Sequence, residues 1–395
     1  TITNVSSDAA DGTYKIGDNI EIKLEFSEKI TLANGTLDLS LNHGNSSNLK
    51  VSVSAFSEKT SATKDYTVAV GDTTNDLDIT SMALSASNTT LLDLGNNAPS
   101  QLTPTTTFAT NKNIVIDGNR PEVMKIRSTS AAGYYKVGDV IPIVLYFTEA
   151  VTTTAANIIT GTLETGSTNA DATIVFPVVS NGTTVTKNYT VRENDFNSSL
   201  TMNTIAVSSG QRVNDQAGNE MTDKSIPSGK NLADEIVDIF VDGVVPVDPG
   251  TAITMVSTGG NVVADKYNDT NTGVDFTVAI QSDASLVGGT IQIKAKIAPN
   301  GWTSIGDPHT ITDANKTAGS ATISVLSAPV EALTGFATDA EIKIKATVTD
   351  VAGNSTDWAE STNSLTVDVT RPTITSATST TDAGLYNTAD AINTT

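Results

Sequence analysis

Carboxylate and amide side chains recur in matching turns of this chain of 395 residues. Asp117 lies in "VIDGNRP", Glu149 in "FTEA", and Asn214, Asp215 and Asn219 in "VNDQAGN". Oxygen atoms of this kind are the ligands that Ca²⁺ takes, typically about six to eight at a time. If these turns converge, the sequence predicts a calcium site built from distant segments.

The same residue types recur further along the chain. The second set consists of Asp242, Asp283, Asp350 and Asn354. Near the start, Glu28 and Asp93 occupy the equivalent places, without the preceding linker that supplies the third acid. Asp and Asn also favour turns because their side chains bond to nearby backbone groups. Ordinary turn chemistry therefore remains the alternative to calcium binding.

Residues for nucleophilic or acid–base catalysis are sparse. The two histidines, His43 in "LNHGN" and His309 in "GDPHTI", stand at non-equivalent places, and we predict both to be exposed loop residues. No G-x-S-x-G turn occurs. The absence of cysteine excludes disulfides, thiolate zinc sites and cysteine nucleophiles. We predict that the chain is not an enzyme.

Aromatic residues are too few to suggest a broad sugar-binding platform, at 5% of the chain. An exposed Trp302 at the hairpin tip "NGWTSIG" is the one feature of the sequence that suggests a glycan ligand. Trp358 in "STDWAES" is expected to pack against the body of its domain.

The charge of the chain is strongly negative. It has 23 basic and 44 acidic residues, a net charge of −21. Such a surface repels phosphate, so nucleic acid is an unlikely partner. No apolar run approaches the roughly 18 residues that span a bilayer. No export signal is found in the given chain.

A segment of the sequence occurs in two similar copies. Residues 12–30, "GTYKIGDNIEIKLEFSEKI", return as residues 133–151, "GYYKVGDVIPIVLYFTEAV". Ile20, Ile22 and Leu24 alternate with charged residues, the period of a strand with one face in water. The repeat therefore predicts β-strands in tandem copies.

Other segments repeat in the same order, each copy ending in a strand, an Asp and then a Pro. "NIVIDGNRPEV" (113–123) matches "DIFVDGVVPVD" (238–248), and loosely "LTVDVTRPTIT" (365–375). We predict three units and a partial fourth, with these boundaries: 1–118, 119–245, a divergent 246–370, and 371–395. Seven to nine short strands per unit favour antiparallel sandwiches arranged as a rod.

The motifs "DG.YK.GD.I.I...F.E.V", "YTV..GD...DL", "D..GN" and "IVID...P" resemble the tandem immunoglobulin-like repeats of large bacterial cell-surface proteins. The resemblance implies an extracellular stalk or assembly module of an adhesin, a surface layer or a filament. In that topology the turn after the second strand, the turn before the last strand and the incoming linker meet at one end. The predicted calcium would stiffen each junction. The alternative is the accessory region of a secreted polysaccharide-active enzyme.

The last 25 residues, 371–395, contain only the start of another repeat. A segment so short cannot bury a core alone. We expect either that the polypeptide continues or that the segment adds a strand to another copy or another surface protein.

Overall fold

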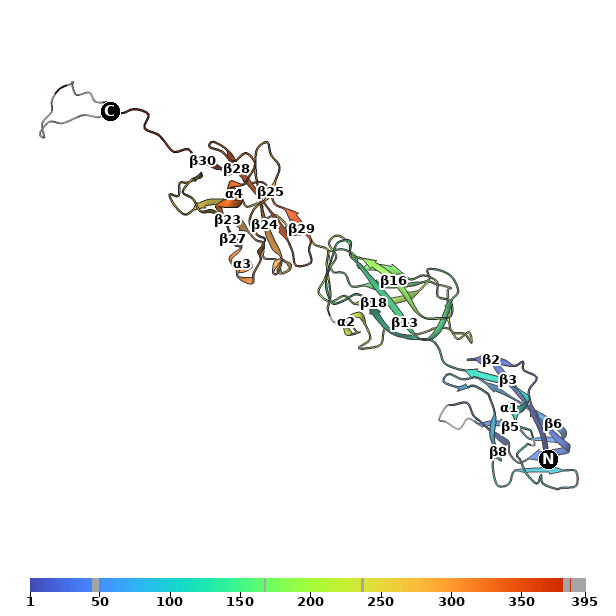
Figure 1. The fold of residues 1–395 in the computed structure, drawn as a ribbon. Coiled ribbons are helices and arrows are strands. Elements are labelled where there is room, and N and C mark those ends of the chain that lie inside the picture. Colours follow the sequence, from blue (N-terminus) through green and yellow to red (C-terminus); the bar gives the residue numbers. More distant parts are fainter. Residues whose placement is uncertain (45–49, 105, 167, 236–237, 379–383, 385–395) are drawn as a thin grey trace. The chain divides into compact units, whose positions relative to one another are not determined.

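A computed structural model of the protein describes residues 1–395 except 45–49, 105, 167, 236–237, 379–383 and 385–395 (Figure 1). The described residues form two compact units. The first comprises Thr1–Gly133, Asp139–Val191 and Phe196–Val241, and the second comprises Tyr134–Gly138, Arg192–Asp195 and Asp242–Thr395. The division at residues 118, 245 and 370 stays a prediction. Most of the segment predicted to add a strand to another copy, residues 379–383 and 385–395, lies outside the described part of the chain.

The first third of the chain folds into small sheets around one core. One sheet has the order β1 (Ile2–Ser6), β3 (Asn19–Ala33) and β6 (Phe56–Thr67), and β9 (Thr90–Asp93) also pairs with β3. Another has the order β5 (Lys50–Val53), β4 (Leu37–Leu41) and β8 (Ile79–Leu84). A third has the order β2 (Gly12–Lys15), β10 (Ile114–Asp117) and β7 (Thr73–Thr74), and α1 spans Phe108–Asn111.

The alternating pattern predicted for β3 is present. Ile20, Ile22 and Leu24 are fully buried, while their neighbours Glu21 and Lys23 remain partly exposed. Full burial of each such side chain contributes about 1.5–3 kcal/mol of transfer free energy. Burial of one face therefore sets the register of the strand.

The following repeat reproduces the first two sheets. One has the order β11 (Val123–Ser128), β13 (Val140–Thr153) and β16 (Gly182–Thr190), with β19 (Val213–Asn214) also on β13. The other has the order β15 (Ala172–Val175), β14 (Ile159–Leu163) and β18 (Met202–Val207). The remaining elements are β12 (Gly133–Lys136), β17 (Phe196–Asn197), α2 (Leu232–Glu235) and β20 (Ile239–Asp242).

The second unit is a separate sandwich with its own core, which includes Tyr267 and Trp358. Its smaller sheet has the order β21 (Thr254–Thr258), β23 (Gly273–Ala279) and β27 (Ser320–Leu326). Its larger sheet follows the order β22 (Lys266–Asn268), β30 (Leu365–Asp368), β28 (Glu341–Thr349), β24 (Thr290–Ile297) and β25 (Thr303–Ser304). The others are β26 (His309–Thr310) on β24, β29 (Ser355–Asp357) on β28, η1 (Ala284–Leu286), α3 (Asp313–Ala318) and α4 (Ser327–Glu331).

These sheets confirm the predicted fold class, all-β with immunoglobulin-like antiparallel sandwiches in tandem. Helices are short wherever the chain is described, the longest being the six residues of α3. None of the described helices is long and apolar enough to cross a membrane.

Candidate metal centre

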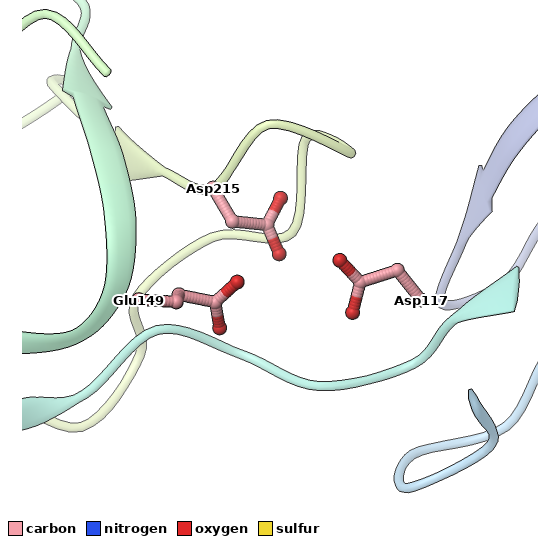
Figure 2. A group of neighbouring side chains, drawn as sticks. All are labelled: Asp117, Glu149 and Asp215. Carbon is pink, nitrogen blue, oxygen red and sulfur yellow. The ribbon is translucent and has the colours of Figure 1, made fainter. Parts of the chain in front are cut away.

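Three acidic residues that the sequence places far apart converge in the first unit. Asp117 ends β10, Glu149 lies in β13, and Asp215 follows β19. One carboxylate oxygen from each lies within 4.8 Å of the others. Figure 2 shows the three carboxylates facing a common point. We call Asp117, Glu149 and Asp215 the first acidic group.

Glu149 reaches this point from a strand and not from the turn that we expected. β13 runs unbroken from Val140 to Thr153. Its pairing with β16 loses register between Tyr146 and Val151, where an irregularity interrupts the ladder. Beyond that break Val151 pairs with β16 again, and β13, which pairs with β11 up to Phe147, pairs with β19 from Thr152. Such irregularities re-aim side chains, and here Glu149 lies within the re-aimed stretch.

The loop after β19 holds Asp215 rigidly. Its Oδ1 accepts hydrogen bonds from the backbone N–H of Gly218 (2.6 Å) and Asn219 (2.7 Å). Its Oδ2 accepts one from Asn219 Nδ2 (2.7 Å). Gly218 has φ of +97°, a backbone conformation that side-chain-bearing residues rarely adopt. The Asp-x-x-Gly-Asn spacing therefore builds a closed loop that positions one carboxylate.

Asn219 joins this loop to the segment that ends the preceding repeat. Its Nδ2 donates to the backbone oxygen of Asp117 (2.9 Å), and its Oδ1 accepts from the N–H of Ile16 (2.9 Å). The side chain is 3% exposed. Asn219, predicted as a ligand, therefore acts here as a brace between backbone segments. Asn214, also predicted as a ligand, is half-buried, and its Oδ1 bonds to no described residue.

The sequence analysis did not identify Gly118, the residue that lets the linker pack closely against the backbone of Ala69 and Asp72. A Cβ at Gly118 would lie 2.3 Å from the backbone oxygen of Ala69 and 2.7 Å from that of Asp72. The available signal was the dipeptide Asp-Gly at 117–118, which recurs at 242–243. Repetition of glycine after the acid indicates close backbone contact in both copies.

The electrostatics of the first acidic group disfavour three negative charges. Burial, together with the nearby charges of Asp215 and Asp117, raises the pKa of Glu149 to about 7. Burial also raises the pKa of Asp117, with Asp215 adding to the rise and the N–H of Asn119 opposing it. Carboxylates in this situation are relieved by a proton or by a cation.

The second unit contains a corresponding set, Asp242, Asp283, Asp350 and Asn354, which we call the second acidic group. Asp350 Oδ1 accepts from the N–H of Gly353 (2.7 Å) and Asn354 (2.8 Å). Asn354 Nδ2 donates to Asp350 Oδ2 (2.9 Å) and to the backbone oxygen of Asp242 (2.8 Å). The brace is thus the same as that made by Asn219.

Asp242 is an unusual feature of this second group. It is 2% exposed, and its Oδ1 accepts from the N–H of Val244 (3.1 Å). Its Oδ2 is buried and bonds to no described residue. Burial, opposed by the hydrogen bond from the N–H of Val244 and assisted by the charges of Asp350 and Asp283, raises the pKa of Asp242 to about 6. A buried carboxylate oxygen without a partner among the described residues costs free energy while it is ionised.

Asp283, the third acid of this group, is hydrogen-bonded to Ser285. Its Oδ1 accepts from the N–H and the hydroxyl of Ser285, both at 2.9 Å, and so caps η1. Over the described residues, only the first acidic group brings three acid oxygens within 4.8 Å of one another. The second group therefore presents fewer free carboxylates.

The first repeat has a loop like that of Asp215 and Asn219, formed by Asp93 and Asn97, without the linker that would supply a third acid. Asp93 Oδ1 accepts from Asn97 N–H (2.8 Å), and Asn97 Nδ2 donates to Asp93 Oδ2 (3.0 Å). These hydrogen bonds lower the pKa of Asp93. Glu28 is exposed. Asp93, half-buried at the end of β9 and bonded to the exposed loop that follows, is thus an easily ionised acid.

The prediction that both histidines are exposed loop residues is wrong: His309 is half-buried in β26, and His43 is buried. It is 2% exposed, and its Nδ1 lies 3.1 Å from Asp72 Oδ1 without hydrogen-bond alignment. Tyr66 donates its hydroxyl to Asp72 Oδ2 (2.7 Å). The turn residue points inward because Asp72, distant in sequence, lies beneath it. His43, Asp72 and Tyr66 are all at most 2% exposed, so this group is closed to a substrate.

The two tryptophans differ in burial: Trp358 is buried, whereas Trp302 is half-buried. Trp358 is 2% exposed and belongs to the core, which confirms the packing prediction. Trp302 is half-buried beneath the ammonium groups of Lys296 (4.3 Å from the ring centroid) and Lys345 (5.1 Å). These cation–π contacts occupy the ring face that a sugar would use.

Comparison with known proteins adds little to this picture. No protein-family model and no curated protein matches the chain. Among solved structures, the chain is similar to domains A168–A170 of titin, at 11% identity and a TM-score of 0.30. That match covers 92% of this chain and 98% of the titin chain.

Proposed function

We propose that this chain is a non-catalytic, extracellular structural module whose acidic groups bind Ca²⁺. It would serve as a stalk or assembly module of an adhesin, a surface layer or a surface filament. The observation that carries the proposal is the convergence of Asp117, Glu149 and Asp215 within 4.8 Å. The recurring tandem sandwiches support a structural role.

The arrangement suits calcium better than a transition metal. The donors are carboxylate and amide oxygens, which are hard ligands that Ca²⁺ accepts in flexible geometry. Asp117, Glu149 and Asp215 would supply three charged ligands, and Asn214 Oδ1 is a fourth oxygen without a partner among the described residues. In the second acidic group, the buried Asp242 Oδ2 offers the corresponding donor.

The mechanical consequence follows from where these residues lie in the chain. Asp117 ends the last strand of one repeat, whereas Glu149 and Asp215 belong to the next. A cation bound to all three would fix the linker 118–122 relative to the following strands. It would remove the repulsion among the carboxylates at the same time.

The test is a comparison of the calcium-loaded and chelated protein. We expect calcium to raise the melting temperature, to slow proteolysis within 118–122 and to change the small-angle scattering profile. Mg²⁺ at equal concentration serves as the control, because it demands near-octahedral geometry and dehydrates reluctantly. Identical melting, cleavage and scattering with calcium and with chelator would refute the proposal.

The alternative, the accessory region of a secreted polysaccharide-active enzyme, is favoured by one specific observation. A cavity of about 650 Å³ with a polar lining adjoins the first acidic group. A catalytic domain encoded in the same open reading frame would support this alternative over the stalk.

A further inference from the structure

A cavity in the first unit has a lining that neither the fold nor the acidic group requires. Its volume is about 650 Å³, within the range of small-molecule sites, and it opens to solvent, since Thr13, Asn75 and Gln216 are exposed. Its polar lining consists of Thr13, Thr73, Thr74, Asn75 and Gln216, beside Asp117. The cavity lies on the sheet β2–β10–β7, against the loop that follows Asp215.

The lining side chains are neutral groups that both donate and accept hydrogen bonds. The side chains of Thr13, Thr73, Asn75 and Gln216 form no hydrogen bond with any residue that the structure describes, whereas Thr74 Oγ1 donates to the backbone oxygen of Asp76. Four hydroxyl or amide groups are therefore available to a ligand.

The charge of the lining restricts the ligand. Asp117 is its one ionisable residue, and no basic side chain lines the cavity among the described residues. An anionic ligand would meet only a like charge there. The apolar part is small and aliphatic, with Val115 half-buried on the sheet. We propose that this cavity binds a neutral saccharide, whose hydroxyl groups match the threonine, amide and carboxylate groups.

The second copy of the repeat shows that the lining is not demanded by the fold. The residues that build the framework are the same in both copies, including Gly12 and Gly133 in the matched strands. The lining changes: Thr13 corresponds to Tyr134 and Thr73 to Phe196 in the second repeat, and Gln216 of the second repeat corresponds to Val351 in the divergent third. Thr74 and Asn75 correspond to the polar residues Asn197 and Ser198, so the difference in polarity is confined to the other three polar positions.

The cavity and the first acidic group share a structural element. Gln216 directly follows Asp215 in the loop 215–219. If calcium binds as proposed above, it would hold this loop and so fix one wall of the cavity. We therefore expect calcium to strengthen saccharide binding, and this part of the inference alone rests on the proposed function.

The experiment is a titration of the whole chain with neutral gluco-, manno-, galacto- and xylo-oligosaccharides, followed by saturation-transfer NMR and calorimetry. We expect at least one series to bind, and both Thr73→Val and Gln216→Ala to weaken it roughly tenfold each. Thr73→Val keeps the side-chain shape, so folding is retained. Val351→Ala, at the equivalent loop position in the second unit, and Trp302→Ala are matched controls that should leave binding unchanged.

Three results would overturn the inference: no series binds, binding survives both cavity substitutions, or binding is lost in Trp302→Ala. Repeating the titration with chelator separates the two proposals. Saccharide binding without any effect of calcium would leave the cavity assignment intact and remove the coupling. Calcium binding without saccharide binding would refute the cavity assignment alone.

Discussion

The two acidic groups share one framework but differ in the acid that completes them. Asn219 and Asn354 make matching hydrogen bonds. Each donates to an Asp in its own loop and to a backbone oxygen at the end of an earlier strand, that of Asp117 or Asp242. In the first group Glu149 adds a carboxylate close to the other two, whereas in the second Asp283 caps η1. The framework can therefore be built without a complete ligand set.

This difference separates two roles that the sequence motif combines. The brace formed by the Asn is structural and should act with or without a cation. The third carboxylate is the variable part, and in calcium proteins the number of charged ligands tunes affinity. We expect the first group to bind calcium more tightly than the second. The following predictions, from the largest effect to the smallest, test that separation.

Removing the brace should have the largest effect. Asn219→Ala and Asn354→Ala should each lower the free energy of unfolding by about 3 kcal/mol, because buried hydrogen-bonding groups lose their partners. Urea unfolding in the presence of chelator measures both. Losses that differ greatly between the two variants would contradict a shared framework.

Changing the third carboxylate should separate the groups. Glu149→Gln should weaken calcium binding roughly 10- to 100-fold, since a charged ligand becomes neutral. Asp283→Asn should change affinity only a few-fold, because that carboxylate is already engaged by Ser285. The calcium dependence of the melting temperature reports both. Equal effects at the two positions would contradict the distinction.

With chelator present, the dependence of stability on pH should report the repulsion within the first acidic group. The pKa of Glu149 is raised to about 7 from an ordinary value of 4.5, so folding favours its protonated form. Below pH 4.5 both states are protonated and no penalty exists. As pH rises towards 7 the unfolded state ionises freely, and stability falls by about 1–2 kcal/mol after solvent screening is allowed for.

Melting temperatures at about pH 4 and about pH 8, on either side of the window between the two pKa values, measure this loss. Glu149→Gln should flatten the profile, and Asp242→Asn should flatten the part that lies nearer pH 6. Saturating calcium should reverse the trend, because calcium binds the ionised carboxylates. A flat wild-type profile in chelator would show that these acids do not oppose one another.

The smallest effect is expected in the first repeat. Asn97 makes the same contacts to Asp93, but in an exposed loop. Asn97→Ala should change the free energy of unfolding by no more than about 0.5 kcal/mol. This variant is the matched control for Asn219→Ala, and a loss of similar size would show that the loop itself, not its contact with the linker, carries the stability.

Repetition made much of this structure predictable. The alternation through Ile20, Ile22 and Leu24 predicted a half-buried strand, and the matched turns predicted the approach of Asp117 to Asp215. Periodicity reports which face is buried, so it works wherever one face is in water.

Features that depend on contacts between distant segments were not predictable in this way. The sequence predicted a turn at Glu149, because an unbroken strand that changes partners has the same residues as two strands. It placed His43 on the surface, because nothing local reveals the Asp72 beneath it. The unshared Oδ2 of Asp242 likewise depends on packing.

The most direct test of the central claim is isothermal titration of metal-free protein with calcium, comparing the wild type with Glu149→Gln. We predict saturable binding at or below extracellular calcium concentrations, on the order of 1 mM, with the tightest site lost in the variant. Absence of saturable binding, or a tightest site that persists unchanged in Glu149→Gln, would contradict the assignment of Asp117, Glu149 and Asp215 as a calcium site.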